Sequence, residues 1–146
     1  QKTAKDALKL LQEEYGPKFH LTNSAQQRKR IAAAFALDGK VVYGKAFDAI
    51  LISREVEVNF DSIDSIHKNL KFITLVEIKG TRRKVGGSFK GLFFSISTAE
   101  VLVAQSLGKQ FKFIFVDVNN KYIEELTLKA VYERAKAIYP TWSISF

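Results

Sequence analysis

Two short segments of the sequence place charged residues within apolar runs. Asp48 lies in the run 47–52, and Glu77 and Lys79 lie in the run 73–81. A lone charge in such a run is costly to bury unless it is paired or bound to a metal ion. An Asp on one strand and a Glu-x-Lys on the next can form a divalent-metal site with a lysine beside it. Such a site suits hydrolysis of a phosphodiester bond.

The positions of the two acids along their strands predict that they meet. We expect a long hairpin of strands 47–54 and 72–79, with Asp48 at the start of the first strand and Glu77 near the end of the second. Antiparallel pairing then brings both carboxylates to the same end of the sheet. They offer hard oxygen ligands for Mg²⁺, with Mn²⁺ as a substitute, and the main-chain carbonyl of Ile78 could supply another ligand.

Lys79 shares a strand face with Glu77, because side chains two residues apart in a strand point to the same side. Its ammonium could hold the attacking water or stabilise charge on the phosphate. Taken alone, a Glu-x-Lys pair is more often a salt-bridged pair on a solvated sheet face. The matching apolar run around Asp48, the basic loop that follows the strand and the basic chain favour the nuclease hypothesis.

Composition limits the class of protein. The 146 residues suffice for one domain with a single core, and the net charge is +8. That charge favours a polyanionic partner, usually nucleic acid, with a membrane surface as the competitor. No apolar run approaches the ~18 residues of a membrane-spanning helix, and no signal peptide is visible.

The residue types also bear on location and completeness. The sequence has no cysteine, which excludes disulfides and cysteine-ligated zinc and is consistent with a reducing cytoplasm. Because the chain starts at Gln1 and contains no methionine, we expect that residues or a partner domain are missing upstream. We therefore expect residues 1–146 to be one nuclease domain, either whole or part of a longer chain.

The elements that must position these residues follow from apolar periodicity and turn signals. Helices are predicted over 3–15, 24–37, 99–107 and 124–138, and strands over 40–43, 47–54, 55–60, 71–79, 92–96 and 111–118. Residues 61–70 are expected to form a loop or one helical turn. This order predicts an α/β sandwich with a mixed central sheet flanked by helices.

Two basic segments are candidate nucleic-acid contacts. One lies in the second predicted helix and the other in the glycine-rich loop 81–91, and they comprise Arg28, Lys29, Arg30, Arg82, Arg83, Lys84 and Lys90. Arginines and open backbone amides in such a loop can follow a phosphate backbone. The alternatives are a solvated helix face for the first segment and a mobile, solvated loop for the second.

Other residues that could do chemistry carry weaker patterns. His20 and His67 have no Cys or His at ligand spacing, so structural or surface roles are expected for both. No nucleophile elbow supports a serine hydrolase. The phenylalanines of 111–115 are expected in the core. The tail residues expected to pack against the core or a partner subunit are Trp142, Ile144 and Phe146.

The combination of Asp48, the segment Glu77-Ile78-Lys79, the helix 98–107 and the strand 111–118 resembles the PD-(D/E)xK nuclease superfamily. The resemblance covers roughly residues 3–118 and implies the restriction-endonuclease-like fold. By it, Asp48 and Glu77 would match the metal-binding acids and Lys79 the catalytic lysine.

The resemblance implies further residues and has departures. The first helix of the superfamily often carries an extra Glu, which Glu14, or else Glu13, could match. The helix after the motif strand sometimes carries a functional Gln, which maps to Gln105 or to no residue. No proline precedes the candidate Asp and its gap to the Glu-x-Lys is long. The alternative acids in the same connection are Asp61 and Asp64.

Together these inferences predict a metal-dependent DNA endonuclease that acts on double-stranded DNA in the cytoplasm. A restriction endonuclease, or its cleavage domain or subunit, is the first choice, and a junction-resolving or repair nuclease is the alternative. A non-catalytic nucleic-acid-binding module is the alternative from another class. Cutting both strands of a duplex generally needs two active sites, so a homodimer or a partner subunit is expected.

Overall fold

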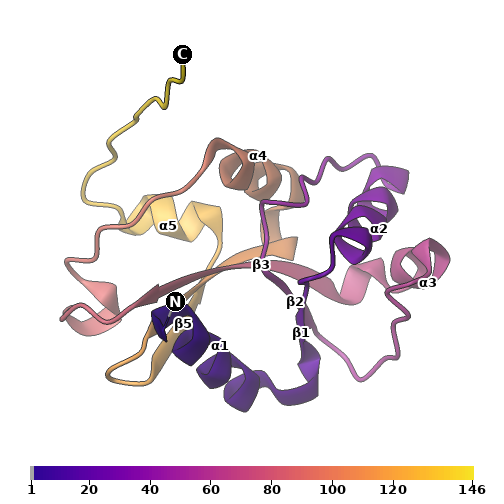
Figure 1. Cartoon of the computed structure of the whole chain (residues 1–146), viewed down its shortest axis with the longest axis horizontal. Coiled ribbons are helices and arrows are strands. Elements are labelled where there is room, and N and C mark those ends of the chain that lie inside the picture. Colours follow the sequence, from indigo (N-terminus) through magenta and orange to yellow (C-terminus); the bar gives the residue numbers. More distant parts are fainter. Residues whose placement is uncertain (1) are drawn as a thin grey trace.

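In the computed structural model of the chain, which describes residues 2–146, five strands form one mixed sheet in the order β1-β2-β3-β4-β5 (Figure 1). The strands are β1 (Phe19–Leu21), β2 (Ala49–Ile52), β3 (Ile73–Thr81), β4 (Phe111–Asp117) and β5 (Tyr122–Leu126). The central strand β3 pairs antiparallel with β2 and parallel with β4, and the outer pairs are antiparallel. The predicted mixed sheet is confirmed.

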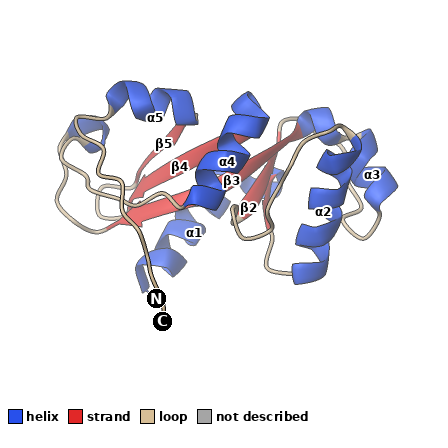
Figure 2. Cartoon of the chain, turned by 90° about the horizontal axis from the view of Figure 1, so that it is seen from above, coloured by secondary structure: helices blue, strands red, loops and turns tan. Residues whose placement is uncertain are grey.

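Helices cover both faces of this sheet (Figures 1 and 2). The helices are α1 (Lys2–Tyr15), α2 (Ala25–Leu37), α3 (Ile63–Lys68), α4 (Thr98–Leu107) and α5 (Leu128–Arg134). In the view of Figure 1, α1 lies below the sheet, and α4 and α5 lie above it. The predicted α/β class, a mixed sheet flanked by helices, is therefore confirmed. No helix within residues 2–146 combines the length and the apolar character needed to cross a membrane.

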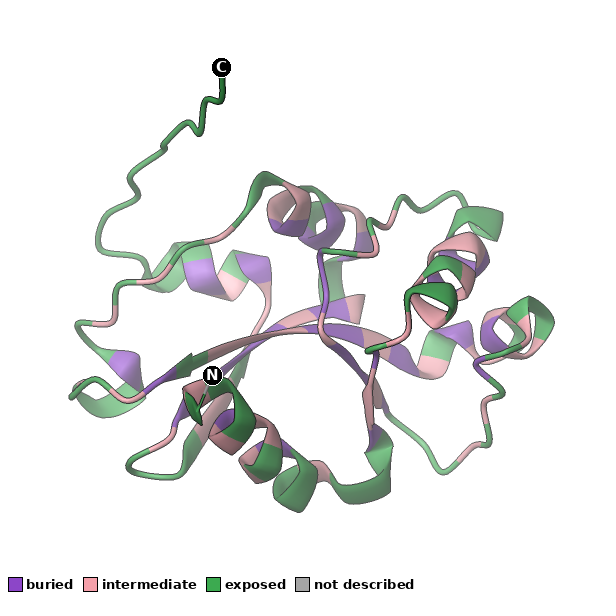
Figure 3. Cartoon of the chain, viewed as in Figure 1, coloured by how far each residue is buried: buried purple, intermediate pink, exposed green. Residues whose placement is uncertain are grey.

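Side chains along β4 point alternately to the two faces of the sheet, and each face has its own apolar core. Phe113 and Phe115 point into the core shared with α2, α4 and α5, whereas Ile114 and Val116 point into the core shared with α1. A strand buried on both faces is apolar at every position, as the run from 111 to 116 nearly is. Figure 3 shows the same distribution, with buried positions along the sheet and on the inner sides of the helices.

The central strand β3 begins as a core strand and ends as a polar one. Ile73, Leu75 and Val76 are fully buried, whereas Glu77 and Lys79 keep a part of their surface exposed. Gly80 then allows the first turn of α1 to approach closely, because a Cβ at this position would lie 3.2 Å from the Cβ of Ala7. The end of β3 is therefore the place where the sheet opens toward solvent between helices.

Several predicted elements are wrong. Residues 40–43, 55–60 and 92–96 form no strand within the described part of the chain, and β1 was not predicted. The segment 92–96 does alternate between exposed and core-facing residues, but it has no strand partner. Residues 61–70 contain α3, which begins after the N-cap Ser62.

The end of the chain also differs from expectation. The first part of the predicted helix 124–138 is a strand, because 122–126 pairs with the free edge of β4, and α5 starts only after the N-cap Thr127. The expectation that the tail packs against the core is wrong for Trp142, whose side chain is 90% exposed. Packing of the tail against a partner subunit stays a prediction.

Candidate active site

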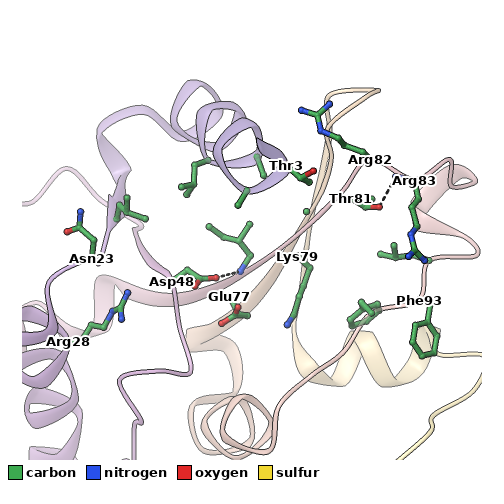
Figure 4. A pocket seen from close by; sticks show the side chains of 18 residues that line it. Thr3, Asn23, Arg28, Asp48, Glu77, Lys79, Thr81, Arg82, Arg83 and Phe93 are labelled. Atoms are coloured by element: carbon green, nitrogen blue, oxygen red, sulfur yellow. Dashed lines mark hydrogen bonds between the residues drawn. The ribbon is translucent and has the colours of Figure 1, made fainter. Parts of the chain in front are cut away.

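A cleft with a volume of about 840 Å³ opens at the polar end of β3 (Figure 4). Its lining includes Asp48, Glu77 and Lys79, which the sequence placed in two separate apolar runs. The first two turns of α1, the chain before and within the start of α2, and the segment 92–94 complete the walls. Elements far apart in the sequence therefore meet at one concave surface.

Asp48 is held in place by main-chain hydrogen bonds on both sides. Its N–H donates to the carbonyl of Val76 (2.7 Å), and its own carbonyl accepts from the N–H and the hydroxyl of Thr22 (3.1 and 2.8 Å). Its carboxylate oxygen Oδ2 accepts from the N–H of Ile78 (2.9 Å). The side chain thus continues the β2–β3 ladder by one bond, and a carboxylate has further lone pairs with which to bind a ligand.

Glu77 reaches Asp48 because of the register of the hairpin. Ala49 pairs with Val76, so the next residue on β3 lies beside the residue that precedes β2. The predicted antiparallel pairing of these strands is confirmed, and the Glu77 carboxyl group shares a hydrogen bond with Asp48.

This neighbourhood changes the acidity of Glu77. Burial raises the pKa of its carboxyl group to about 9, helped by the hydrogen bond and the charge of Asp48 and by the charge of Glu100. Lys79 opposes this rise. Two carboxyl groups this close cannot both carry full charge without a counterion, so one takes a proton. A cation placed between them would relieve the same repulsion.

Lys79 is engaged by a residue that the sequence analysis did not single out. Its ammonium Nζ lies 2.9 Å from Oε1 of Glu100, and both side chains are mostly buried. Glu100 lies in the first turn of α4, three residues after the N-cap Ser97, the spacing of a capping-box glutamate. Ser97 does cap the helix, but the carboxylate of Glu100 turns to Lys79. In the sequence, Glu100 is marked only as a charged residue among the mostly apolar residues of this helix.

Three of the predicted nucleic-acid contacts line the cleft: Arg28, Arg82 and Arg83. Arg28 donates from Nε to the carbonyl of Thr22, and Arg82 forms an ion pair with Asp6. Arg83 is exposed and makes only a main-chain bond to the Thr81 hydroxyl. Arg83 is therefore the one of the three whose guanidinium the described structure leaves without a protein partner.

The other predicted contacts lie away from the cleft lining. Lys29, Lys84 and Lys90 are exposed on the surface, and Arg30 pairs with Asp61 at 3.3 Å. In the loop 81–91, Arg82 and Arg83 therefore line the cleft, whereas Lys84 and Lys90 do not.

The structure does not bring the extra helix glutamate to the site. Glu13 and Glu14 are exposed near the end of α1, whereas the residues of α1 that line the cleft end at Leu8. A rise of ~1.5 Å per residue puts Glu14 about 9 Å along the helix from Leu8. As a catalytic residue, Glu14 is thus not supported by this geometry.

The remaining candidates also lie elsewhere. Gln105 is exposed on α4, and neither Asp61 nor Asp64 lines the cleft. His20 stacks on Phe60, with ring centroids 4.1 Å apart, and the ring of His67 bonds to Asp38. These are the structural and surface roles expected of the two histidines.

The donor set of the cleft suits a hard divalent cation. Among residues 2–146, no group of three or more Asp, Glu, His or Cys side chains is placed to hold one metal ion. Mg²⁺ in proteins is usually held by one or two carboxylates, with water and substrate phosphate as the other ligands. Asp48 and Glu77 provide those two carboxylates, and a role for the carbonyl of Ile78 stays a prediction.

Comparisons of the chain with protein-family models, with curated proteins and with solved structures found no match. The functional argument therefore depends on the geometry of the cleft. Its elements are two hydrogen-bonded carboxyl groups, a buried lysine–glutamate pair and an arginine-bearing rim.

Proposed function

We propose that the chain is a metal-dependent DNA endonuclease that hydrolyses phosphodiester bonds in the cleft at the end of β3. The observation that carries this proposal is the meeting of Asp48 and Glu77 beside Lys79 in one cleft. These are the residue types that bind Mg²⁺ and stabilise charge on a phosphate. The net charge of +8 supports a polyanionic substrate.

Each side chain has a defined task in this proposal. Asp48 and Glu77 would hold the cation, which when bound would supply an activated water and neutralise charge on the phosphate. Lys79 stabilises the negative charge that builds on the phosphate, and Glu100 fixes the position of its ammonium. Arg83 contacts a neighbouring phosphate as part of the non-specific affinity.

The finer fold assignment belongs to the same proposal. The Glu-x-Lys strand β3 is central, lies antiparallel to the strand that follows Asp48 and is parallel to β4 after the crossover through α4. This order follows the one that the resemblance to the PD-(D/E)xK superfamily implies, and supports a restriction-endonuclease-like fold. A restriction endonuclease or its cleavage subunit is the first assignment, and a junction-resolving or repair nuclease is the second.

The partner proposals follow from the chemistry. A DNA substrate and the cysteine-free composition favour a cytoplasmic location for the enzyme. One cleft cuts one strand at a time, so cleavage of both strands of double-stranded DNA calls for a homodimer or a partner subunit.

The test is cleavage of supercoiled plasmid with Mg²⁺, with Mn²⁺ or with EDTA. We expect metal-dependent nicking or linearisation by the wild type, lost on Lys79→Ala by about 100-fold or more, since one lost charge-stabilising donor costs that much. Lys9→Ala, an exposed lysine on α1 outside the cleft, is the matched control and should cut normally. Thermal unfolding of both variants separates lost catalysis from lost folding.

A non-catalytic nucleic-acid-binding module is the second candidate. The Lys79–Glu100 ion pair favours it, because both groups would then serve only to stabilise the contact between β3 and α4. DNA binding by the wild type without cleavage under any of the metals would contradict the nuclease and leave the module. Cleavage that persists in Lys79→Ala would contradict the role of the lysine.

A further inference from the structure

One aromatic side chain on the cleft wall faces solvent where its neighbours face the core. Residues 92–97 form an extended segment in which Leu92, Phe94 and Ile96 pack against the core. The two residues between them are exposed, and one of these is Ser95. The other is Phe93, which is 70% exposed and lines the cleft. Because it is largely exposed, this ring contributes little to folding and is accessible to a ligand in the cleft.

A second exposed ring lies beside the first. The ring of Tyr139, from the chain after α5, is centred 6.4 Å from that of Phe93, at an interplanar angle of 39°. Tyr139 is 72% exposed, so the pair does not bury either ring. Two segments far apart in the sequence thus present adjoining aromatic surfaces at one margin of the cleft.

The aromatic pair adjoins the proposed chemistry and its charges. In the view of Figure 4, the labelled side chains follow one another in the order Arg28, Asp48, Glu77, Lys79 and Phe93, with Arg83 above Phe93. The exposed guanidinium of Arg83 lines the same part of the cleft. An aromatic face next to cationic groups is the arrangement that binds unpaired nucleotides, with a base on the ring and a phosphate on the charge.

We infer that Phe93, assisted by Tyr139, stacks an unpaired base next to the scissile phosphate, so that the substrate is DNA with a junction between single-stranded and duplex regions. The bases of an uninterrupted duplex stack on each other and show no face to the ring. Only an unpaired base can use both the ring and the adjoining phosphate contact. This inference rests on the proposed function for the identity of the ligand, and favours a junction or repair enzyme within it.

Binding without cleavage tests the inference directly. Fluorescence anisotropy in EDTA compares a forked DNA, whose strands are unpaired on one side, with a blunt duplex of the same length. We expect the wild type to prefer the fork, and Phe93→Ala to weaken fork binding roughly tenfold, within the span of ~5- to 150-fold that stacking of one base covers. Duplex binding should not change. Phe146→Ala removes a still more exposed phenylalanine, in the tail and outside the cleft lining, and is the control.

A spectroscopic variant reports the stacking itself. Phe93→Trp in a Trp142→Phe background leaves a single tryptophan at the aromatic pair, because the chain has one Trp. We expect its fluorescence to be quenched by the fork and left unchanged by the duplex. Quenching by neither DNA would contradict stacking even if both bind.

The outcomes separate this inference from the proposed function. Equal affinity for fork and duplex, or an equal loss on both from Phe93→Ala, would overturn the inference while plasmid cleavage could still support the nuclease. A fork preference that depends on Phe93, together with no cleavage under any metal, would keep the stacking site and remove the nuclease. Dimerisation of the wild type that Phe93→Ala abolishes in size-exclusion chromatography would overturn the inference, since the rings would then serve another copy of the chain.

Discussion

The two ends of the cleft are built in different ways. At the acidic end, Asp48 is fixed by main-chain bonds to Thr22, Val76 and Ile78, and the Glu77 carboxyl group bonds to Asp48. At the basic rim, the side chains of Arg83 and Phe93 are exposed and have no comparable network. The groups proposed for chemistry are held by the sheet. The groups proposed for binding lie on segments outside the sheet. Changes at the acidic end should therefore affect rate, and changes at the rim should affect affinity and its salt dependence.

The largest expected effect is at the acidic end. Glu77→Gln keeps the size of the side chain and a hydrogen-bonding group toward Asp48 but removes the charge that would hold the cation. We expect plasmid cleavage to fall by about 1,000-fold, as for the loss of a principal electrostatic group. The matched control is Asp61→Asn, an exposed acid outside the cleft. Equal losses in both variants would show that the effect does not depend on a carboxylate in the cleft.

The next effect concerns Glu100, which acts through Lys79. Glu100→Gln leaves a polar partner but no charge beside the ammonium, so we expect cleavage to fall by ~10- to 100-fold, the usual cost of losing such a supporting residue. DNA affinity in EDTA should change little, because the group lies behind the lysine. A variant that cuts at the wild-type rate would show that the Lys79–Glu100 pair only stabilises the fold.

The stability of the metal-free protein should depend on pH through Glu77. Its pKa is about 9 in the folded chain against an ordinary value of 4.5, so between these values the folded state binds a proton that the unfolded state lacks. The free energy of unfolding then falls as pH rises through this window, because stability falls wherever the folded state binds more protons. Thermal unfolding in EDTA should show this decline in the wild type, and a weaker one in Glu77→Gln.

The same thermal unfolding can be measured with added Mg²⁺ in place of EDTA. A cation that binds only the folded state stabilises it by mass action, and most strongly where the carboxyl group ionises most easily. We therefore expect the gain in melting temperature from Mg²⁺ to grow with pH. A gain that is the same at all pH values would argue against a cation at Glu77.

The smallest effect is expected at the rim. Arg83→Ala should weaken binding of DNA only a few-fold and reduce the slope of affinity against salt by about one phosphate contact. Lys109→Ala, a basic residue remote from the cleft lining, is the control. A loss of cleavage at saturating DNA in Arg83→Ala would place this arginine with the catalytic groups and blur the comparison.

Most of the acidic end of the cleft could be predicted from the sequence. An Asp and a Glu-x-Lys within apolar runs are costly unless they meet, and the β2–β3 pairing does bring them together. Glu100 could not be found in this way, because three residues after Ser97 a glutamate is already explained as a helix cap. Its actual partner, Lys79, is set by the packing of α4 on the sheet, which the local sequence does not encode.

The C-terminal third shows where local patterns fail. Ile123 and Leu126, followed by the apolar residues of α5, have spacings that a helix could also use, so one helix over 124–138 was predicted. The unpaired edge of β4 decides otherwise, since 122–126 completes its hydrogen bonds before Thr127 starts the helix. The segment 92–96 shows the reverse case, in which strand-like alternation exists without any strand to pair with.

The place of β3 in the middle of the sheet has a consequence for amide hydrogen exchange. At Leu75 and Val76, strand β3 is paired with β2 on one side and β4 on the other, whereas β1 and β5 are edges. Amides of edge strands exchange by local fraying, but those in a central strand exchange mainly when the whole domain unfolds. We therefore expect the amides of Leu75 and Val76 to be among the slowest to exchange. A ligand that binds only the folded cleft would slow their exchange further, because it stabilises the folded state against unfolding of the whole domain.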